Sequence, residues 1–279
     1  MMLRSLLLPF AAISLLYLLS PMPALAQGSA RPISQCQAIA QTLPDVAFAS
    51  FKPHSAFNSQ ALASDEVKIT YIGHSTFLIE TPGGVSIATD YSGWYVPPKT
   101  PDVVTMNKAH SSHYTLTPDP AIKHVLHGWG DDGDPADHDV VIGDTYIRNV
   151  TTDIRAGGGM MEPDGNSIFI FEVAGLCIGH LGHLHHELDE SDYAEIGRLD
   201  VLMVPVDGGL TMGAESMSRV VTRLRSALIL PMHRRGPPVT NFLHMFGDAF
   251  DRSFAVEASV SVSVRSLPRK PLIYILQGV

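Results

Sequence analysis

The chain has 279 residues, of which 45% are hydrophobic, and a formal net charge of −9 at pH 7. This hydrophobic content supplies a sizeable core and argues against a disordered chain. The acidic balance argues against a protein that binds nucleic acid, because such proteins need a basic surface.

The N-terminus has the three-part layout of a secretory signal peptide. Arg4 gives a positive start, residues 6–19 form an uncharged apolar run, and Ala24-Leu25-Ala26 is a small-x-small cleavage signal. The run is shorter than the about 20 residues that span a bilayer, which disfavours the alternative of an uncleaved anchor. We expect residues 1–26 to be removed and the mature protein to be exported, periplasmic or secreted, with no membrane segment.

Residues 27–64 are predicted to form an entry segment with a short helix over residues 35–41, followed by one domain over residues 65–279. The chain has two cysteines, Cys36 and Cys177. An exported location permits a disulfide bond between them. Cys177 lies in an apolar run, however, that equally suits a buried free thiol. The sequence leaves the pairing open.

The first half of the domain is rich in short apolar runs separated by turn residues, which is typical of strands. A Pro-Gly-Gly turn at residues 82–84 joins two of them into a hairpin. Residues 116–139 are rich in proline, glycine and aspartate and are predicted to be a loop. The predicted strands of this half cover residues 67–71, 76–81, 85–89, 102–106, 167–173 and 176–178, with two further short strands within 140–150.

The second half changes to alternating strands and helices. Residues 214–224, for example, carry apolar side chains at helical spacing. Predicted helices cover residues 189–196, 214–224 and 241–250, and predicted strands cover residues 200–206, 227–232, 260–264 and 272–276. Such alternation after a β-rich start predicts an α/β architecture in which helices cover sheets.

Many of the 13 histidines stand in groups after predicted strands. Loops held by strand ends are where chemistry usually sits, and imidazole is the commonest neutral metal ligand. Three or four histidines that converge from separate loops would suit Zn²⁺ in tetrahedral geometry, although each one alone could be a surface or hydrogen-bonded side chain. The grouped histidines are His110 and His113, then His180, His183, His185 and His186, then His233.

Two segments resemble the opening of the metallo-β-lactamase superfamily: Ile69-Thr-Tyr-Ile-Gly-His-Ser-Thr-Phe-Leu-Ile-Glu80 and Ile87-Ala-Thr-Asp90. Within this superfamily, the chain resembles the lactonase-like zinc hydrolases, which begin with a Gly-His-Ser or Gly-His-Ala hairpin. The resemblance implies a four-layer αββα sandwich of the α/β (α+β) class, with a metal site at one edge between the two sheets. It continues through residues 104–113, 166–186, 200–209 and 231–233.

The first ligand loop departs from the family pattern. The family reads His-x-His-x-Asp-His there, whereas this chain reads Lys108-Ala-His-Ser-Ser-His113. His110 and His113 match the second and third histidines of the motif. Lys108 replaces the first histidine and Ser112 replaces the aspartate. These changes remove one ligand and one anionic group, which favours a single metal ion over two.

The later motifs also differ from the family. His183 stands where a metal-bridging aspartate is expected, and His233 matches the final histidine. The remaining family histidine has no counterpart, and Asp153 is the nearby group that could supply an oxygen. The resemblance therefore implies one divalent ion, with Zn²⁺ favoured over other divalent metals. Its ligands are expected among His110, His113, His183 and His233.

Three further residues are candidates for catalysis: Asp153, Asp207 and Lys108. One of the aspartates would have to replace the missing carboxylate that orients the nucleophilic water. Lys108 is expected to face the same region as His110, where it would pair with an aspartate or anchor an anionic substrate. Coordination by Lys108 would require a strongly lowered pKa. His74, at the corner of the first hairpin, is a candidate for orienting a ligand or a water.

Two functions of different classes follow from these features. The first is a metal-dependent hydrolase that acts on a small-molecule ester, lactone, amide or phosphoester through a metal-activated water. The second is a non-catalytic exported metal- or ligand-binding protein that retains the fold, because a fold does not dictate a function. Metal content per chain and turnover on model substrates would separate the two.

Overall fold

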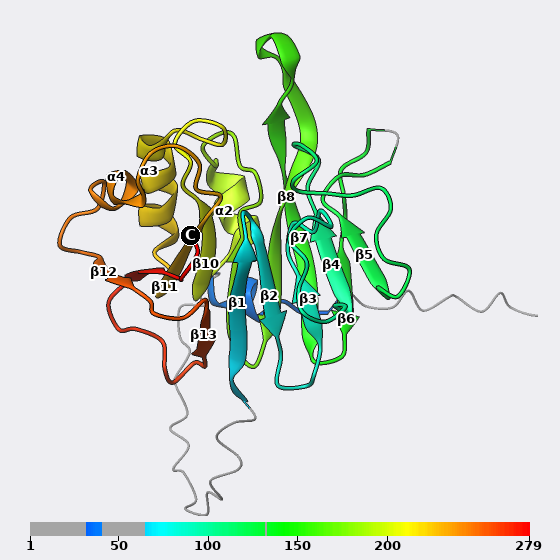
Figure 1. Cartoon of the computed structure of the whole chain (residues 1–279), viewed down its shortest axis with the longest axis horizontal. Coiled ribbons are helices and arrows are strands. Elements are labelled where there is room, and N and C mark those ends of the chain that lie inside the picture. The colour runs from blue at the N-terminus through cyan, green and yellow to red at the C-terminus, as the bar shows by residue number, and fades with distance from the viewer. Residues whose placement is uncertain (1–31, 41–64, 132) are drawn as a thin grey trace, which may run out of the picture. The chain divides into compact units, whose positions relative to one another are not determined.

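The computed structural model describes residues 32–40, 65–131 and 133–279. The predicted signal peptide, residues 1–26, lies outside the described residues, as does most of the predicted entry segment. The described residues form two β-sheets that pack face to face, with helices against the outer face of the larger sheet (Figure 1). None of these helices is long and apolar enough to cross a membrane.

The smaller sheet has six strands, four of which run in the same direction. β1 and β3 are each antiparallel to β2, and β3, β4 and β5 are parallel to one another. The C-terminal ends of β1, β3 and β4 therefore lie at one edge of this sheet. In spatial order the strands are β13 (Ser259–Val262), β1 (Val67–Gly73), β2 (Thr76–Glu80), β3 (Ser86–Ala88), β4 (Val103–Met106) and β5 (His124–His127).

The larger sheet has eight strands and also has a parallel block. β9, β10, β11, β14 and β12 are parallel, whereas β8, β7 and β6 pair antiparallel. The β7–β8 hairpin extends beyond its neighbours (Figure 1). In spatial order the strands are β12 (Asp251–Phe254), β14 (Leu272–Ile275), β11 (Leu228–Met232), β10 (Val201–Pro205), β9 (Leu176–His180), β8 (Met161–Val173), β7 (Thr145–Arg155) and β6 (Asp139–Ile142).

Both faces of the larger sheet are buried, as the alternation along β8 shows. Phe169 and Phe171 pack against the smaller sheet, whereas Ile168 and Ile170 pack under the helices. Because successive side chains of a strand point to opposite faces, a continuous apolar run is what a sheet covered on both sides requires. The helices on the outer face are α1 (Gln35–Ala40), α2 (Glu190–Ile196), α3 (Ala214–Leu224) and α4 (Val239–Leu243).

The outer face of the smaller sheet is covered by loops in the described part of the chain. Ala88, Val104 and Met106 pack there against Tyr91 and Ile122, which lie outside regular elements. Two packed sheets with helices on the larger one agree with the metallo-β-lactamase sandwich that the sequence implied. The described residues place no helix on the smaller sheet, so that layer of the implied four is made of loops here.

Five elements differ from the sequence-based expectation. β5 lies within the segment predicted to be a loop, because its short run gains its strand geometry from parallel pairing with β4. β12 was not predicted, and α4 ends at Leu243 rather than at residue 250. β7 and β8 extend into polar segments in which apolar and polar residues do not alternate. These segments are strands because they pair with each other across the hairpin.

The described residues 32–40 pack as part of the same unit as the sheets. Cys36 and Cys177 form a disulfide bond, with their Cα atoms 5.9 Å apart, which settles the pairing that the sequence left open. Ser34 Oγ donates a hydrogen bond to Glu172 Oε1 at 2.5 Å, and the same carboxylate forms a buried ion pair with Arg148. These contacts attach α1 to β7, β8 and β9.

Removing the disulfide is expected to lower the free energy of unfolding by about 2–5 kcal/mol, because the bond restricts the unfolded chain. It joins residues 141 positions apart. Urea denaturation of a Cys36→Ala/Cys177→Ala variant beside the natural protein measures the difference. An unchanged midpoint would contradict a stabilising role for the bond.

Candidate metal centre

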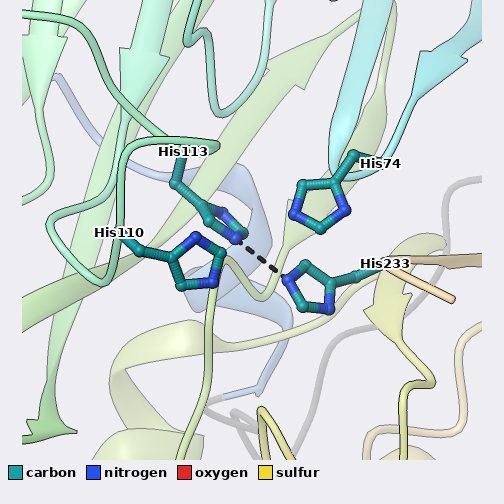
Figure 2. Close-up of side chains that lie close together, drawn as sticks. All are labelled: His74, His110, His113 and His233. Carbon is teal, nitrogen blue, oxygen red and sulfur yellow. Dashed lines mark hydrogen bonds between the residues drawn. The ribbon is translucent and has the colours of Figure 1, made fainter. Parts of the chain in front are cut away.

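Five imidazole rings converge where the parallel strands of both sheets end. Ring centroids of His183 lie 4.7 Å from His110, 4.6 Å from His113 and 4.8 Å from His233. The centroid of His74 lies 4.0 Å from that of His233. One nitrogen each of His74, His110, His113 and His233 lies within 4.8 Å of the others, and Figure 2 shows these four rings directed toward one another.

The convergence follows from strand direction. His74 follows β1, the loop with His110 and His113 follows β4, His183 comes soon after β9, and His233 follows β11. Parallel strands bring their C-terminal ends to one edge of a sheet, and the two sheets meet at this edge. Side chains from four separate loops therefore reach one point without any of them being adjacent in the sequence.

Two of the histidines sit on an unusual backbone. His74 and His233 have φ of 54° and 53°, in the left-handed region that non-glycine residues rarely adopt. The His233 N–H donates a hydrogen bond to the His74 carbonyl at 2.6 Å, which fastens the two corners together. A Cβ on Gly73 would lie 2.4 Å from Tyr95 Cδ1, so only glycine lets Tyr95 pack over this corner. Backbone strain of this kind is concentrated at functional sites.

Side-chain amides hold the other loops. Asn107 donates to Asp90 Oδ1 at 2.8 Å and accepts from the Ser167 N–H at 2.7 Å, which ties the loop after β4 to both sheets. The His113 N–H donates to the His110 carbonyl at 2.9 Å. The His183 N–H donates to Asn166 Oδ1 at 2.7 Å. These contacts fix the directions of the imidazoles before any ligand arrives.

Buried carboxylates set the tautomers of His113 and His233. His113 Nδ1 lies 2.6 Å from Asp90 Oδ2, and His233 Nδ1 lies 2.8 Å from Asp207 Oδ2. An ionised carboxylate only accepts hydrogen bonds, so both Nδ1 atoms carry the proton. Each neutral ring then presents an unprotonated Nε2, as metal-binding histidines with carboxylate partners do.

The two unprotonated nitrogens face each other. His113 Nε2 and His233 Nε2 lie 3.0 Å apart, and both rings are fully buried (Figure 2). Two lone pairs at this distance repel unless a cation lies between them. Two nitrogens that each lie about 2.0–2.1 Å from one tetrahedral zinc are about 3.3 Å apart, so a small outward movement of either ring accommodates an ion.

A second pair of rings lies beside the first. His110 Nε2 is 3.0 Å from His183 Nε2. His185 accepts the Arg155 N–H at Nδ1 and donates from Nε2 to the Leu210 carbonyl, and the same Nε2 lies 2.8 Å from His183 Nδ1. His183 Nδ1 is therefore an acceptor, and a neutral His183 directs its proton from Nε2 to His110.

Comparison with known proteins assigns the family. A family profile described as the beta-lactamase superfamily domain matches residues 68–233, more than half of the chain. The chain belongs to the metallo-β-lactamase superfamily. A candidate Zn-dependent hydrolase of this superfamily from Thermotoga maritima shares the fold with a TM-score of 0.54 and 28% identity, over 75% of this chain and 98% of that one.

Curated relatives cover nearly the same stretch. The chain is 27% identical to the UPF0173 metal-dependent hydrolase of Methanosphaerula palustris over 72% of its own length and 97% of the relative. It is 26% identical to a metal-dependent hydrolase of Pyrococcus furiosus over 62% of its length and 87% of that protein. A structure from Parabacteroides distasonis, with a TM-score of 0.53 and 16% identity, shows the fold alone.

The four histidines expected from the metallo-β-lactamase motifs lie together in the structure. His110, His113 and His233 belong to the group whose nitrogens approach one another, and His183 packs against all three. The fourth member of that group is His74, which the sequence placed only as a residue that orients a ligand or water. Its place in the family's Gly-His-Ser hairpin, next to the strand end, was the signal for a larger role.

Lys108 lies outside the cluster, contrary to the expectation that it faces the site. Its ammonium pairs with Glu162 on β8, not with Asp153 or Asp207. The Lys108 N–H donates to the Gly165 carbonyl, so the backbone lies against the extended β7–β8 hairpin. The prediction was wrong because β8 was expected to begin at residue 167, which left Glu162 off the sheet.

The two candidate aspartates have different positions. Asp153 Oδ1 accepts a hydrogen bond from the Asp164 N–H, so its carboxylate is held within the hairpin rather than by the histidines. Asp207 is buried and accepts from His233 and from backbone N–H groups of the turn after β10. It therefore orients His233 and shapes the turn, and the catalytic role expected from the sequence stays a prediction.

The surroundings keep several rings of the cluster neutral. Burial is the main cause that lowers the pKa of His74 to about 3. Burial also lowers the pKa of His110 to about 4 and lowers the pKa of His183. Neutral imidazole is the form that binds metal, so these shifts favour an ion over protons at pH 7.

The metal-free protein is expected to lose stability as the pH falls from 7 to 5. Histidines in an unfolded chain have a pKa of about 6.5, so below that pH the unfolded state binds protons that His74 and His110 refuse when folded. The midpoint of thermal unfolding should fall by about 5 °C or more. A His110→Gln variant, which lacks one such group, should lose less. If the midpoint of thermal unfolding depended on pH in the same way for both proteins, His110 would not be a ring that stays uncharged in the folded state.

Proposed function

We propose that this protein is an exported metal-dependent hydrolase that acts on a small-molecule ester, lactone, amide or phosphoester. The observation that carries the proposal is the pair of buried Nε2 atoms of His113 and His233, 3.0 Å apart, with both Nδ1 atoms directed at carboxylates. The similar proteins, which are described as metal-dependent and Zn-dependent hydrolases, support the same activity.

The donor set suits one divalent ion, with zinc favoured. His113, His233 and His110 supply three nitrogens with His74 beside them, which leaves the fourth position of a tetrahedral ion open to water. His183 carries its proton on the nitrogen that faces His110, so it supports the ligands without being one of them. An all-imidazole set of borderline donors fits Zn²⁺ better than the hard cations that prefer oxygen. When bound, such an ion polarises the substrate's oxygen and lowers the pKa of water toward neutrality.

The chain's own residues organise the site around this ion. Asp90 and Asp207 hold the Nδ1 protons of His113 and His233, which keeps each Nε2 free to bind. Ser112, which replaces the family's aspartate, places its hydroxyl 2.9 Å from His74 Nε2 and 2.7 Å from His110 Nδ1. The hydroxyl therefore links the two half-exposed edges of the cluster and can pass a proton between them.

One feature favours the second candidate, a non-catalytic metal-binding protein. Among the described residues, the carboxylates that hydrogen-bond to the cluster are Asp90 and Asp207, and both are committed to histidines and turns. A carboxylate is the usual group that orients the water. Neither of these two carboxylates is free to do so. This candidate predicts bound metal without turnover.

Elemental analysis combined with a substrate panel tests the proposal. We expect one equivalent of divalent metal per chain and turnover of at least one model ester, lactone or phosphodiester, lost on chelation and restored by zinc. Two tightly bound equivalents would contradict the single-ion assignment. Metal without turnover would support the second candidate, and absence of metal would contradict the hydrolase and support a non-catalytic protein.

Export is the remaining part of the proposal. The signal-peptide layout of residues 1–26 and the disulfide bond support it, because structural disulfides persist in oxidising compartments. N-terminal sequencing of the protein recovered outside the cytoplasm should find a start near Gln27. A protein that remains in the cytoplasm with Met1 intact would contradict export.

A further inference from the structure

A cavity adjoins the histidine cluster on the side of His74. Its volume is about 410 Å³, which lies in the range of small-molecule sites. Because His74 lines the cavity and belongs to the cluster, a molecule bound in the cavity reaches the proposed metal centre. The lining residues are Tyr71, Ile72, Gly73, His74, Tyr95, Arg234, Gln277, Gly278 and Val279.

One charged side chain lines this cavity, and it is cationic. Arg234 is exposed and forms no ion pair with any other residue that the structure describes. Tyr71 is no anion, because burial and the neighbouring Tyr95 raise its pKa to about 12 despite the nearby Arg234. The Tyr71 hydroxyl donates to the His74 carbonyl at 3.1 Å. Among the described residues, the guanidinium therefore has no carboxylate side chain as a partner within its own cavity.

Arg235 is a second such cation. It is exposed, follows Arg234 directly, and has no ion pair within residues 65–131 and 133–279. It lies two residues after His233, a member of the cluster. Both arginines follow His233, whose left-handed backbone turns the chain at the end of β11.

Most of the described cations in this acidic protein are paired. The net charge is −9, and most described lysines and arginines have carboxylate or carbonyl partners. The described cations without such a partner are Lys99, Arg225, Arg234, Arg235 and Arg269. Two of these five adjoin one cluster, where a neighbouring cation opposes metal binding by Coulomb repulsion. The placement of the two arginines is explained if an anion binds beside the cluster and neutralises their charge.

We infer that Arg234 binds an anionic group of the substrate, a carboxylate or a phosphate, in the cavity beside His74, and that the adjacent Arg235 adds to the positive charge there. The inference rests on the proposed hydrolase function, to which it adds the substrate class. A guanidinium fits both anions because its paired N–H groups match two oxygens. The scissile bond then lies toward the histidines while the anionic group is held by the arginines.

Direct binding tests the anion site without requiring turnover. Metal-loaded protein is titrated calorimetrically with inorganic phosphate and, separately, with glutarate, and the tighter probe identifies the preferred anion. An Arg234→Ala/Arg235→Ala variant should bind that probe at least tenfold more weakly. Arg269→Ala, which removes an exposed unpaired arginine outside the cavity, should bind it as the natural protein does. Equal binding by all three proteins would overturn the inference.

Turnover of a matched ester pair separates this inference from the proposed function. The esters are p-nitrophenyl valerate and p-nitrophenyl hemiglutarate, which share a leaving group and an acyl chain of the same length and differ in the terminal carboxylate. We expect kcat/KM at least tenfold higher for the charged ester, through KM, and a ratio near one in the double variant. Hydrolysis of both esters at equal efficiency would overturn the inference and uphold the hydrolase. Arginine-dependent phosphate binding without hydrolysis of either ester or of any member of the substrate panel would uphold the anion site and contradict the hydrolase.

Discussion

Replacement of His113 by alanine is expected to weaken metal binding by at least about 100-fold and to abolish hydrolysis. A lost ligand costs more than the 10–100-fold that loss of an outer partner costs. His113 is fully buried, and its Nε2 lies 3.0 Å from that of His233. Competition with a chromophoric chelator measures the affinity.

The same change also removes the partner of a buried carboxylate, so folding needs its own check. Asp90 loses the hydrogen bond from His113 Nδ1, which destabilises the protein. His110→Ala, at an exposed position of the cluster, tests the ligand role without that cost. His244→Ala, an exposed histidine after α4, is the matched control. Equal metal affinity in His110→Ala, His113→Ala and the control would contradict the cluster as the metal site.

Asp90→Asn is expected to weaken metal binding by about 10–100-fold while the protein stays folded. The carboxylate accepts from His113 Nδ1 at 2.6 Å and from Asn107 at 2.8 Å. An asparagine that keeps its oxygen toward Asn107 directs its NH₂ group at His113. The ring then has to accept at Nδ1, which moves its proton to Nε2 and blocks the ligand atom.

A second turn carboxylate provides the control for this substitution. Asp144 accepts hydrogen bonds from Thr81 Oγ1 and from the Gly83 N–H and touches no cluster histidine. Asp144→Asn should cost stability but leave metal affinity unchanged. If Asp90→Asn binds metal as tightly as the natural protein, the carboxylate does not set the tautomer of His113.

The convergence of the histidines was predictable because it depends on strand direction alone. Each of His110, His113 and His233 follows a short apolar run, and parallel strands bring such ends to one edge. The family motifs supplied the order of the strands, which spacing cannot. The sequence does not predict His74 as a member of the cluster. A hairpin corner between antiparallel strands does not indicate at which edge of the sheet the corner lies.

The errors arise where tertiary pairing overrides local pattern. The polar half of the β7–β8 hairpin has no apolar alternation, so its strands were cut short and Glu162 was not available as a partner for Lys108. The sequence predicts that Asp207 lies at the site. Its hydrogen bond to His233 cannot be predicted from the sequence, because it depends on the three-dimensional structure. A residue that lies next to a ligand in the sequence motif, such as Lys108, can thus direct its side chain away from the metal centre.

An anomalous-difference map from crystals of the zinc-loaded protein tests the central claim most directly. We predict one strong peak per chain between the facing nitrogens of His113 and His233, at about 2.0–2.1 Å from each Nε2. The peak should also have His110 as a neighbour, because its ring lies 4.6 Å from that of His113. A map with no peak between these nitrogens, or with zinc bound only at other residues, would contradict the assignment of the metal centre.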